Sequence, residues 1–134
     1  MSTRRKILVV EDDPLVRQSF VRLIEEERYE VHSAGSCREG LAVIEEGRFD
    51  LILTDIRLGD DNGLKILARA KKLDPTVVVF MITGFSSMDS MKRALRKGAE
   101  DYIVKPVDTE LLLMKIRNVL ERQSGRRPPG PAPA

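Results

Sequence analysis

Short runs of apolar residues recur along this chain, with room for a helix between most of them. The four clearest runs are ILVV (7–10), LILT (51–54), VVVFMIT (77–83) and DYIVK (101–105). Polar or turn-forming residues flank these runs, a pattern typical of strands that are covered on both faces. A weaker fifth strand is predicted over YEVHSA (29–34), where apolar and polar residues alternate.

Five other segments have the features of helices. They cover residues 14–27, 36–46, 63–73, 87–97 and 108–122. Asp13 and Ser36 are residue types preferred at helix N-caps, and Pro14 suits a first helical position. Gly47 and Gly98 stand where the second and fourth helices should end. Five strands alternating with five helices predict an α/β fold, (βα)5, with a doubly wound five-stranded parallel sheet.

The length of 134 residues suits one domain with a hydrophobic core, which we expect over residues 5–122. Residues 123–134 contain SGRRPPGPAPA, whose proline and glycine content predicts a flexible linker or tail. A single cysteine, Cys37, excludes an internal disulfide and a thiolate metal cluster. No apolar run approaches the roughly 20 residues that span a bilayer, and we find no signal-peptide pattern. We therefore expect a cytoplasmic protein with no membrane contact.

Much of the positive charge lies at the two ends of the chain. The formal net charge is +2, and six basic residues lie in end segments without acids: Arg4, Arg5, Lys6, Arg122, Arg126 and Arg127. Without these six charges, residues 7–121 carry a net charge of −4. This acidic body, with no tryptophan and two tyrosines, argues against direct nucleic-acid binding.

Charged and hydroxyl side chains stand at the ends of the predicted strands. They are Glu11, Asp12 and Asp13 after the first strand, Asp55 after the third, Thr83 after the fourth and Lys105 after the fifth. Because ligands of open parallel sheets bind beyond the carboxyl ends of the strands, we expect these side chains at one edge. Two carboxylates about 4 Å apart repel by roughly 4 kcal/mol at an effective dielectric of 20, so a cation should accompany them.

A magnesium site fits this set of oxygen ligands. Asp12 and Asp55 can supply the carboxylates, with Glu11 bound through water. An aspartate beside such a metal can also attack phosphorus and form an acyl phosphate. Lys105 and Thr83 can neutralise and hydrogen-bond the transferred group, so the sequence predicts phosphoryl transfer at this edge.

In this order and at these spacings, the residues resemble those of two-component response-regulator receiver domains over residues 5–122. The matching positions are Glu11-Asp12, Asp55, Gly63, Thr83-Gly84, Tyr102 and Lys105-Pro106. The stretches TDIRL, MITGF and DYIVKPVD look most like receivers of NtrC-type enhancer-binding transcriptional activators. The resemblance implies a flavodoxin-like fold with strand order 2-1-3-4-5.

The resemblance also implies roles for the residues of the site. Asp55 would accept a phosphoryl group from a phosphohistidine on a sensor histidine kinase. Asp12, Asp55 and the backbone carbonyl of Arg57 would bind Mg²⁺, with Glu11 in support through water. Lys105 would pair with the acids and then with the phosphoryl oxygens. Such receivers catalyse their own phosphorylation and slow dephosphorylation, and they are regulatory domains rather than enzymes.

Receivers of this kind change shape when they are phosphorylated. Thr83 would swing to bond the phosphoryl group, and Tyr102 would rotate inward behind it. This repacks the face made by the fourth helix, fifth strand and fifth helix, which controls an output. The output is an effector domain, as in transcriptional activators, or, for a stand-alone receiver, a downstream protein. Arg57 and Phe85 flank the site, and we expect them to tune the phosphate lifetime.

The last helix contains more apolar residues than one buried face needs. Leu112, Ile116 and Val119 have helical spacing and can face the sheet. The surplus residues are Leu111, Leu113, Met114 and Leu120. They form either a broad core stripe or a dimer or interdomain surface, and of these we hypothesise a homodimer surface.

Other protein classes fit the sequence less well. A haloacid-dehalogenase-type phosphatase has a second aspartate two residues after its nucleophile, where this chain has Arg57. P-loop and dinucleotide-binding glycine motifs do not occur. A pseudo-receiver would lack the acceptor or the lysine. Glu11 stands where the receiver family often has aspartate, and Gly59 where it often has proline; His32 is assigned no role.

Overall fold

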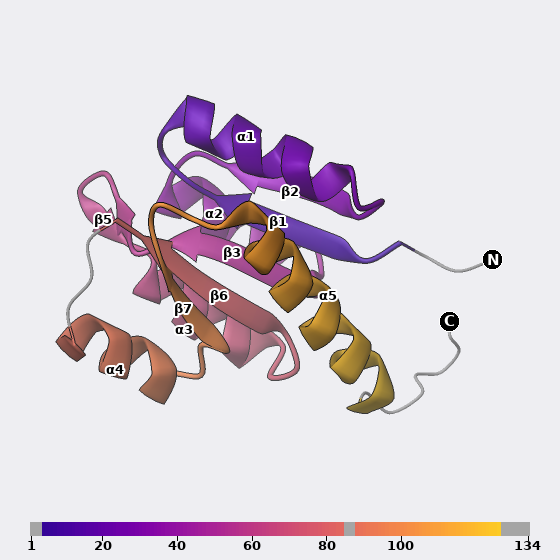
Figure 1. The fold of residues 1–134 in the computed structure, drawn as a ribbon. Coiled ribbons are helices and arrows are strands. Elements are labelled where there is room, and N and C mark those ends of the chain that lie inside the picture. The colour runs from indigo at the N-terminus through magenta and orange to yellow at the C-terminus, as the bar shows by residue number, and fades with distance from the viewer. Residues whose placement is uncertain (1–3, 85–87, 127–134) are drawn as a thin grey trace.

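The computed structural model describes residues 4–84 and 88–126, and Figure 1 shows its elements. The strands are β1 (Lys6–Val10), β2 (Glu30–Ala34), β3 (Leu51–Asp55), β4 (Arg57–Leu58), β5 (Asp61–Asn62), β6 (Val78–Thr83) and β7 (Asp101–Val104). The helices are α1 (Pro14–Glu25), α2 (Cys37–Glu46), α3 (Leu64–Leu73), α4 (Met88–Arg96) and α5 (Thr109–Arg126). Within these described ranges, no helix is long and apolar enough to cross a membrane.

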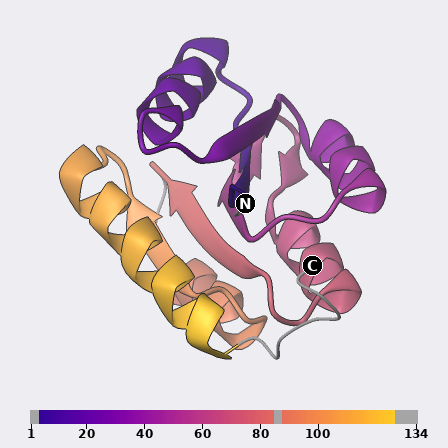
Figure 2. The same ribbon diagram turned by 90° about the vertical axis from the view of Figure 1, so that its right-hand side faces the viewer.

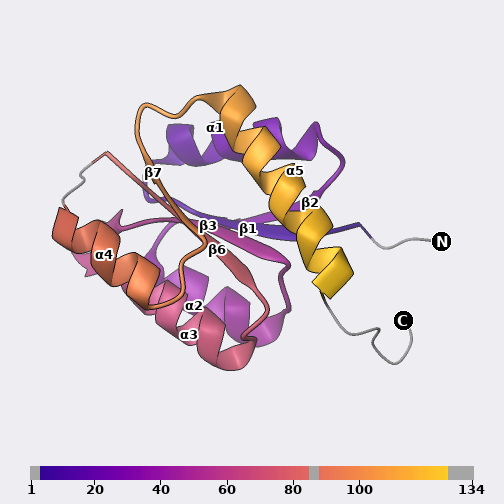
Figure 3. The same ribbon diagram turned by 60° about the horizontal axis from the view of Figure 1, so that its bottom comes forward.

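Five of the strands form one parallel sheet in the order β2-β1-β3-β6-β7. Here β6 and β7 are the predicted fourth and fifth strands, so the (βα)5 sheet and its predicted order 2-1-3-4-5 are confirmed. Helices α1 and α5 cover one face, while α2, α3 and α4 cover the other (Figures 2 and 3). The chain places β2 on one side of β1 and β3 on the other, so the strand order reverses its direction between β1 and β3. In folds of this kind, ligands bind in the crevice beside the carboxyl ends of these two strands.

The central strands are apolar without interruption because both of their faces are covered. In β1, Leu8 and Val10 join the core beneath α2, α3 and α4, whereas Ile7 and Val9 join the core beneath α1 and α5. None of the four is more than 1% exposed. Alternate residues of one strand therefore supply two separate cores.

The predicted helix N-caps are confirmed. The Asp13 carboxylate accepts hydrogen bonds from the backbone N–H groups of Leu15 (2.9 Å) and Val16 (3.3 Å) at the start of α1. The Ser36 hydroxyl accepts one from the N–H of Glu39 at 3.0 Å. These bonds satisfy backbone donors that have no partner within the helix.

Two features of the fold differ from the sequence prediction. The loop after β3 contains the antiparallel pair β4 and β5, in which Arg57 lies opposite Asn62 and Leu58 opposite Asp61. Helix α5 runs to Arg126, four residues past the predicted end at 122. The end of α5 is held because the Leu120 carbonyl and the Gln123 side chain form hydrogen bonds at the amino-terminal edge of the sheet.

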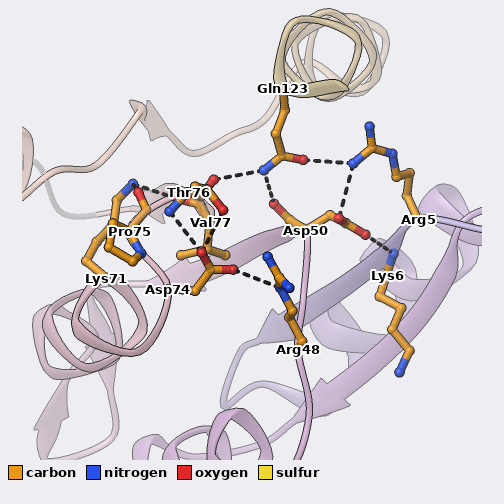
Figure 4. Close-up of polar contacts among 10 residues, drawn as sticks. All are labelled: Arg5, Lys6, Arg48, Asp50, Lys71, Asp74, Pro75, Thr76, Val77 and Gln123. Atoms are coloured by element: carbon orange, nitrogen blue, oxygen red, sulfur yellow. Dashed lines mark hydrogen bonds and ion pairs between the residues drawn. The ribbon is translucent and has the colours of Figure 1, made fainter. Parts of the chain in front are cut away.

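A hydrogen-bonded cluster ties α5 to that edge (Figure 4). The buried Gln123 donates from Nε2 to the carbonyls of Asp50 (3.1 Å) and Thr76 (2.9 Å). Arg5 donates from Nη1 to Gln123 Oε1 at 2.9 Å and to the Asp50 carboxylate at 3.1 Å. Arg5 also donates from Nη2 to the carbonyl of Leu120 at 3.1 Å. We call Arg5, Asp50, Thr76, Leu120 and Gln123 the α5 clasp.

The apolar surplus of α5 is smaller than the sequence predicted. Leu120 is buried and Leu113 is half-buried, and both belong to the core beneath α1 and α5. Leu111 and Met114 remain 42% and 45% exposed. The inclusion of Leu113 and Leu120 in a surface stripe was wrong, because the core side of α5 is wider than three helical positions.

Candidate functional site

Three carboxylates converge where β1 and β3 end. Glu11, Asp12 and Asp55 each offer one oxygen, and these oxygens lie within 4.8 Å of one another. Glu11 and Asp55 are buried, at 3% and 6% exposure, whereas Asp12 is exposed. The pairing of β1 with β3 brings the two strand ends together, so the predicted edge is formed as expected.

Lys105 lies between the two buried acids. Its Nζ is 2.8 Å from Glu11 Oε1 and 2.8 Å from Asp55 Oδ2. Burial acts to lower the pKa of Lys105, but its bonds to Asp55 and Glu11 act the other way and hold this pKa above the ordinary lysine value. Burial raises the pKa of Glu11, although the bond from Lys105 opposes this shift. One ammonium thus balances two carboxylates that would otherwise repel each other.

Backbone N–H groups hold the other oxygens of the three acids. Asp55 Oδ1 accepts from the N–H of Arg57 at 3.0 Å. Glu11 Oε2 accepts from the N–H of Asp13 at 3.2 Å. Asp12 Oδ2 accepts from Gly59 at 3.0 Å, where the glycine has a φ of +63°. These bonds orient each carboxylate before any ligand is present.

Gly63 brings the loop after β3 close to the end of that strand. Its N–H donates to the carbonyl of Ile56 at 2.7 Å. An added Cβ at Gly63 would lie 2.0 Å from the carbonyl oxygen of Asp55 and 3.1 Å from Thr54 Oγ1. The spacing of Gly63 from Asp55 therefore has a steric cause, because only a residue without a side chain fits there.

Thr83 and Tyr102 lie on the strands next to this cluster. Thr83 ends β6, and its carbonyl accepts a hydrogen bond from the N–H of Lys105 at 2.8 Å. Tyr102 lies in β7 opposite Met81 and is half-buried. Burial raises the pKa of the Tyr102 hydroxyl, and the nearby charge of Asp55 adds to this shift. Phe85, the other predicted neighbour of the site, lies outside the described residues.

The donor set suits a hard divalent cation. The cluster offers only carboxylate oxygens, which Mg²⁺ prefers over nitrogen or sulfur ligands. The exposed Asp12 leaves the cluster open to water and to an incoming anion. The residues present therefore fit Mg²⁺, with Lys105 as the fixed positive charge beside it.

Two parts of the site were not predicted from the sequence. The N–H of Gly59 bonds to Asp12, and the N–H of Arg57 bonds to Asp55. Backbone donors of this kind have no signature in residue type. The glycine at position 59 was noted only as a departure from proline, which could not have supplied the N–H.

Known proteins of one family resemble most of this chain. The model of the response regulator receiver domain matches residues 7–117. The chain is 35% identical over 116 residues to the alginate biosynthesis transcriptional regulatory protein AlgB of Pseudomonas aeruginosa, covering 87% of this chain and 26% of AlgB. It is 34% identical over 130 residues to the transcriptional regulatory protein ZraR of Salmonella typhimurium, covering 96% of this chain and 30% of ZraR. The chain thus spans less than a third of either relative.

Solved structures of receiver domains are also similar to this chain. A CheY-like response regulator receiver domain protein from Methanospirillum hungatei has a TM-score of 0.90 at 39% identity, with 93% of this chain and 100% of that one covered. The beryllofluoride-activated NtrC4 receiver domain dimer has a TM-score of 0.81 at 32% identity, with 88% and 98% covered. Both structures are similar to this chain in fold and in sequence.

Proposed function

Because the chain belongs to the response regulator receiver domain family, we propose that it is a phosphoacceptor switch in which Asp55 takes a phosphoryl group from a sensor histidine kinase. One observation carries the proposal. The buried Asp55 carboxylate lies between the Lys105 ammonium and the Arg57 N–H, within 4.8 Å of Asp12 and Glu11 oxygens. This arrangement offers a fixed nucleophile, a fixed cation and ligands for a second cation.

The proposed reaction transfers a phosphoryl group to an aspartate oxygen. A carboxylate oxygen of Asp55 forms a bond to phosphorus while the bond from phosphorus to the donor imidazole nitrogen breaks, which leaves an acyl phosphate. Asp12, Asp55 and the Arg57 carbonyl, with Glu11 through water, would hold Mg²⁺, which neutralises phosphoryl charge when bound. The chain supplies position and charge rather than acid–base chemistry, and in this proposal the domain regulates rather than serving as an enzyme for other substrates.

Lys105 and Thr83 would bind the phosphoryl group and so couple phosphorylation to a change in the rest of the domain. The Lys105 ammonium donates to Glu11 and Asp55 in the structure, and after phosphorylation it would donate one of these hydrogen bonds to a phosphoryl oxygen instead. The backbone N–H of Lys105 donates to the Thr83 carbonyl, so the ends of β6 and β7 are joined by a hydrogen bond. Thr83 would donate its hydroxyl to the phosphoryl group, and Tyr102 would turn inward behind it. Moving an equilibrium from 1:99 to 99:1 takes about 5.5 kcal/mol, which a few charge-assisted hydrogen bonds can supply.

The surface of α4, β7 and α5 is the proposed output face. Leu95, Val104, Leu111 and Met114 expose apolar side chains there. The beryllofluoride-activated NtrC4 receiver domain is itself described as a dimer, which supports a homodimer. The exposed apolar side chains are our reason for assigning it to this face. The output would be an effector domain that controls transcription, as in the relatives of greater length, or a downstream protein if the receiver acts alone. We place the receiver at residues 5–126, because α5 runs to Arg126 and Gln123 is buried, and we place the protein in the cytoplasm.

Beryllofluoride, a phosphoryl analogue, tests this switch. In sedimentation velocity with Mg²⁺, beryllofluoride should shift the parent toward dimers. Asp55→Asn should not respond, because the attachment point is lost. Thr83→Ala should bind the analogue, seen as changed Asp55-region amide signals, yet dimerise several-fold more weakly. A parent that stays monomeric would contradict the dimer, and an equal dimer shift in Thr83→Ala would contradict the role of its hydroxyl.

A further inference from the structure

A guanidinium group holds the backbone of the acidic loop after β1. Arg17, in the first turns of α1, donates from Nη1 to the carbonyl oxygen of Glu11 at 2.8 Å. The N–H of Glu11 donates to the carbonyl of Ala34 at 3.1 Å. The backbone of Glu11 is therefore bonded on both sides, once by β2 and once by α1.

Gly35 makes room for this guanidinium. An added Cβ at Gly35 would lie 2.7 Å from Arg17 Nη1 and 3.3 Å from Arg17 Cζ. The φ of Gly35 is outside the left-handed region, so its backbone is one that any residue can adopt. The missing side chain of Gly35 thus leaves the space that the end of the Arg17 side chain occupies.

We propose that Arg17 is a positioning residue for the magnesium site, and that its guanidinium lies in the space left by the missing side chain of Gly35. This inference rests on the proposed function, because it concerns the Mg²⁺ site formed by Asp12 and Asp55. The carbonyl of Glu11 and the N–H of Asp12 belong to one rigid peptide unit. By fixing that carbonyl, Arg17 fixes the orientation of the unit from which the Asp12 side chain leaves.

The position of Asp12 depends on few contacts. Its carboxylate is exposed and bonds the N–H of Gly59 at 3.0 Å. Without Arg17, the peptide unit between Glu11 and Asp12 could rotate, and Asp12 would spend less time facing Asp55. Mg²⁺ requires near-ideal octahedral geometry, so a misplaced carboxylate weakens its binding directly.

Charge and position predict opposite effects here. Arg17 and Mg²⁺ are both positive, so a purely electrostatic role predicts that removing the guanidinium tightens Mg²⁺ binding. The positioning role predicts that its removal weakens binding. The sign of the change in Mg²⁺ affinity therefore decides between them.

Isothermal titration of the full chain with MgCl₂ tests the inference. Arg17→Met should weaken Mg²⁺ binding by about five- to tenfold, the effect of losing one hydrogen bond. Gly35→Ala keeps every charge and should weaken binding by about two- to fivefold, because the new Cβ displaces the guanidinium. Arg22→Met, an exposed arginine on the same helix, should leave the affinity unchanged.

The double variant Arg17→Met/Gly35→Ala completes the test. The Cβ of Gly35→Ala would meet only the far ends of two flexible side chains, Arg17 and Glu39, so the variant should fold with its thermal midpoint unchanged. The double variant should bind Mg²⁺ no more weakly than Arg17→Met alone, because both changes act on one contact. Unchanged or tighter binding in Arg17→Met, or additive effects in the double variant, would overturn the inference. A parent that binds no Mg²⁺ would instead overturn the metal site, and with it this inference.

Discussion

At the scale of single residues, three glycines shape the site alongside its charged side chains. Gly63 and Gly35 leave space for the Asp55 carbonyl and the Arg17 guanidinium, respectively, whereas Gly59 supplies an N–H to Asp12. The sequence predicted the acids and Lys105, because carboxylates at strand ends have a recognisable pattern. It could not predict which backbone group would bond each carboxylate, since those donors depend on loop geometry rather than on residue type.

Replacing Gly63 tests the steric argument. Gly63→Ala should lower the free energy of unfolding by about 2–4 kcal/mol, because its Cβ would lie 2.0 Å from the Asp55 carbonyl and force the backbone to shift. Urea denaturation measures this change. Gly47→Ala is the matched control, since its Cβ would meet nothing closer than 3.9 Å. Equal stability of the two variants would show that the loop relaxes without cost.

At the scale of elements, the central strands and four of the helices lie within about two residues of where the sequence predicted them. Two-residue strands such as β4 and β5 are too short to give a periodic pattern. The sequence predicted that α5 ends at residue 122, because Gln123 precedes a proline-rich stretch. The helix continues because Gln123 bonds residues that are distant in the sequence. Such contacts are invisible to local pattern.

The α5 clasp gives a prediction at this scale. Gln123→Leu should lower the free energy of unfolding by about 2–3 kcal/mol, because the Asp50 and Thr76 carbonyls and Arg5 each lose a buried partner. Gln18→Leu, on the exposed side of α1, makes the same chemical change and should have little effect. Urea unfolding compares them, and amide exchange should become faster in the last turns of α5. A Gln123→Leu variant as stable as Gln18→Leu would contradict the clasp.

At the scale of the whole molecule, the two ends of the sheet carry different groups of polar residues. The carboxyl ends of β1 and β3 carry the acidic cluster, and the α5 clasp lies at the amino-terminal edge. The layered architecture was predictable because apolar runs and helical segments alternate along the chain. A change at Asp55 can reach the face of α4, β7 and α5 through Lys105, whose N–H bonds the Thr83 carbonyl at 2.8 Å. The proposed switch therefore needs no path through the clasp.

The central claim is that Asp55 accepts a phosphoryl group with the help of a divalent cation. Intact mass after incubation with acetyl phosphate and Mg²⁺ tests it most directly. The account predicts one phosphoryl adduct on the parent and on Asp60→Asn, an exposed aspartate of the same loop, and none on Asp55→Asn or in EDTA. An adduct that persists in Asp55→Asn, or a folded parent that gains none, would contradict the account.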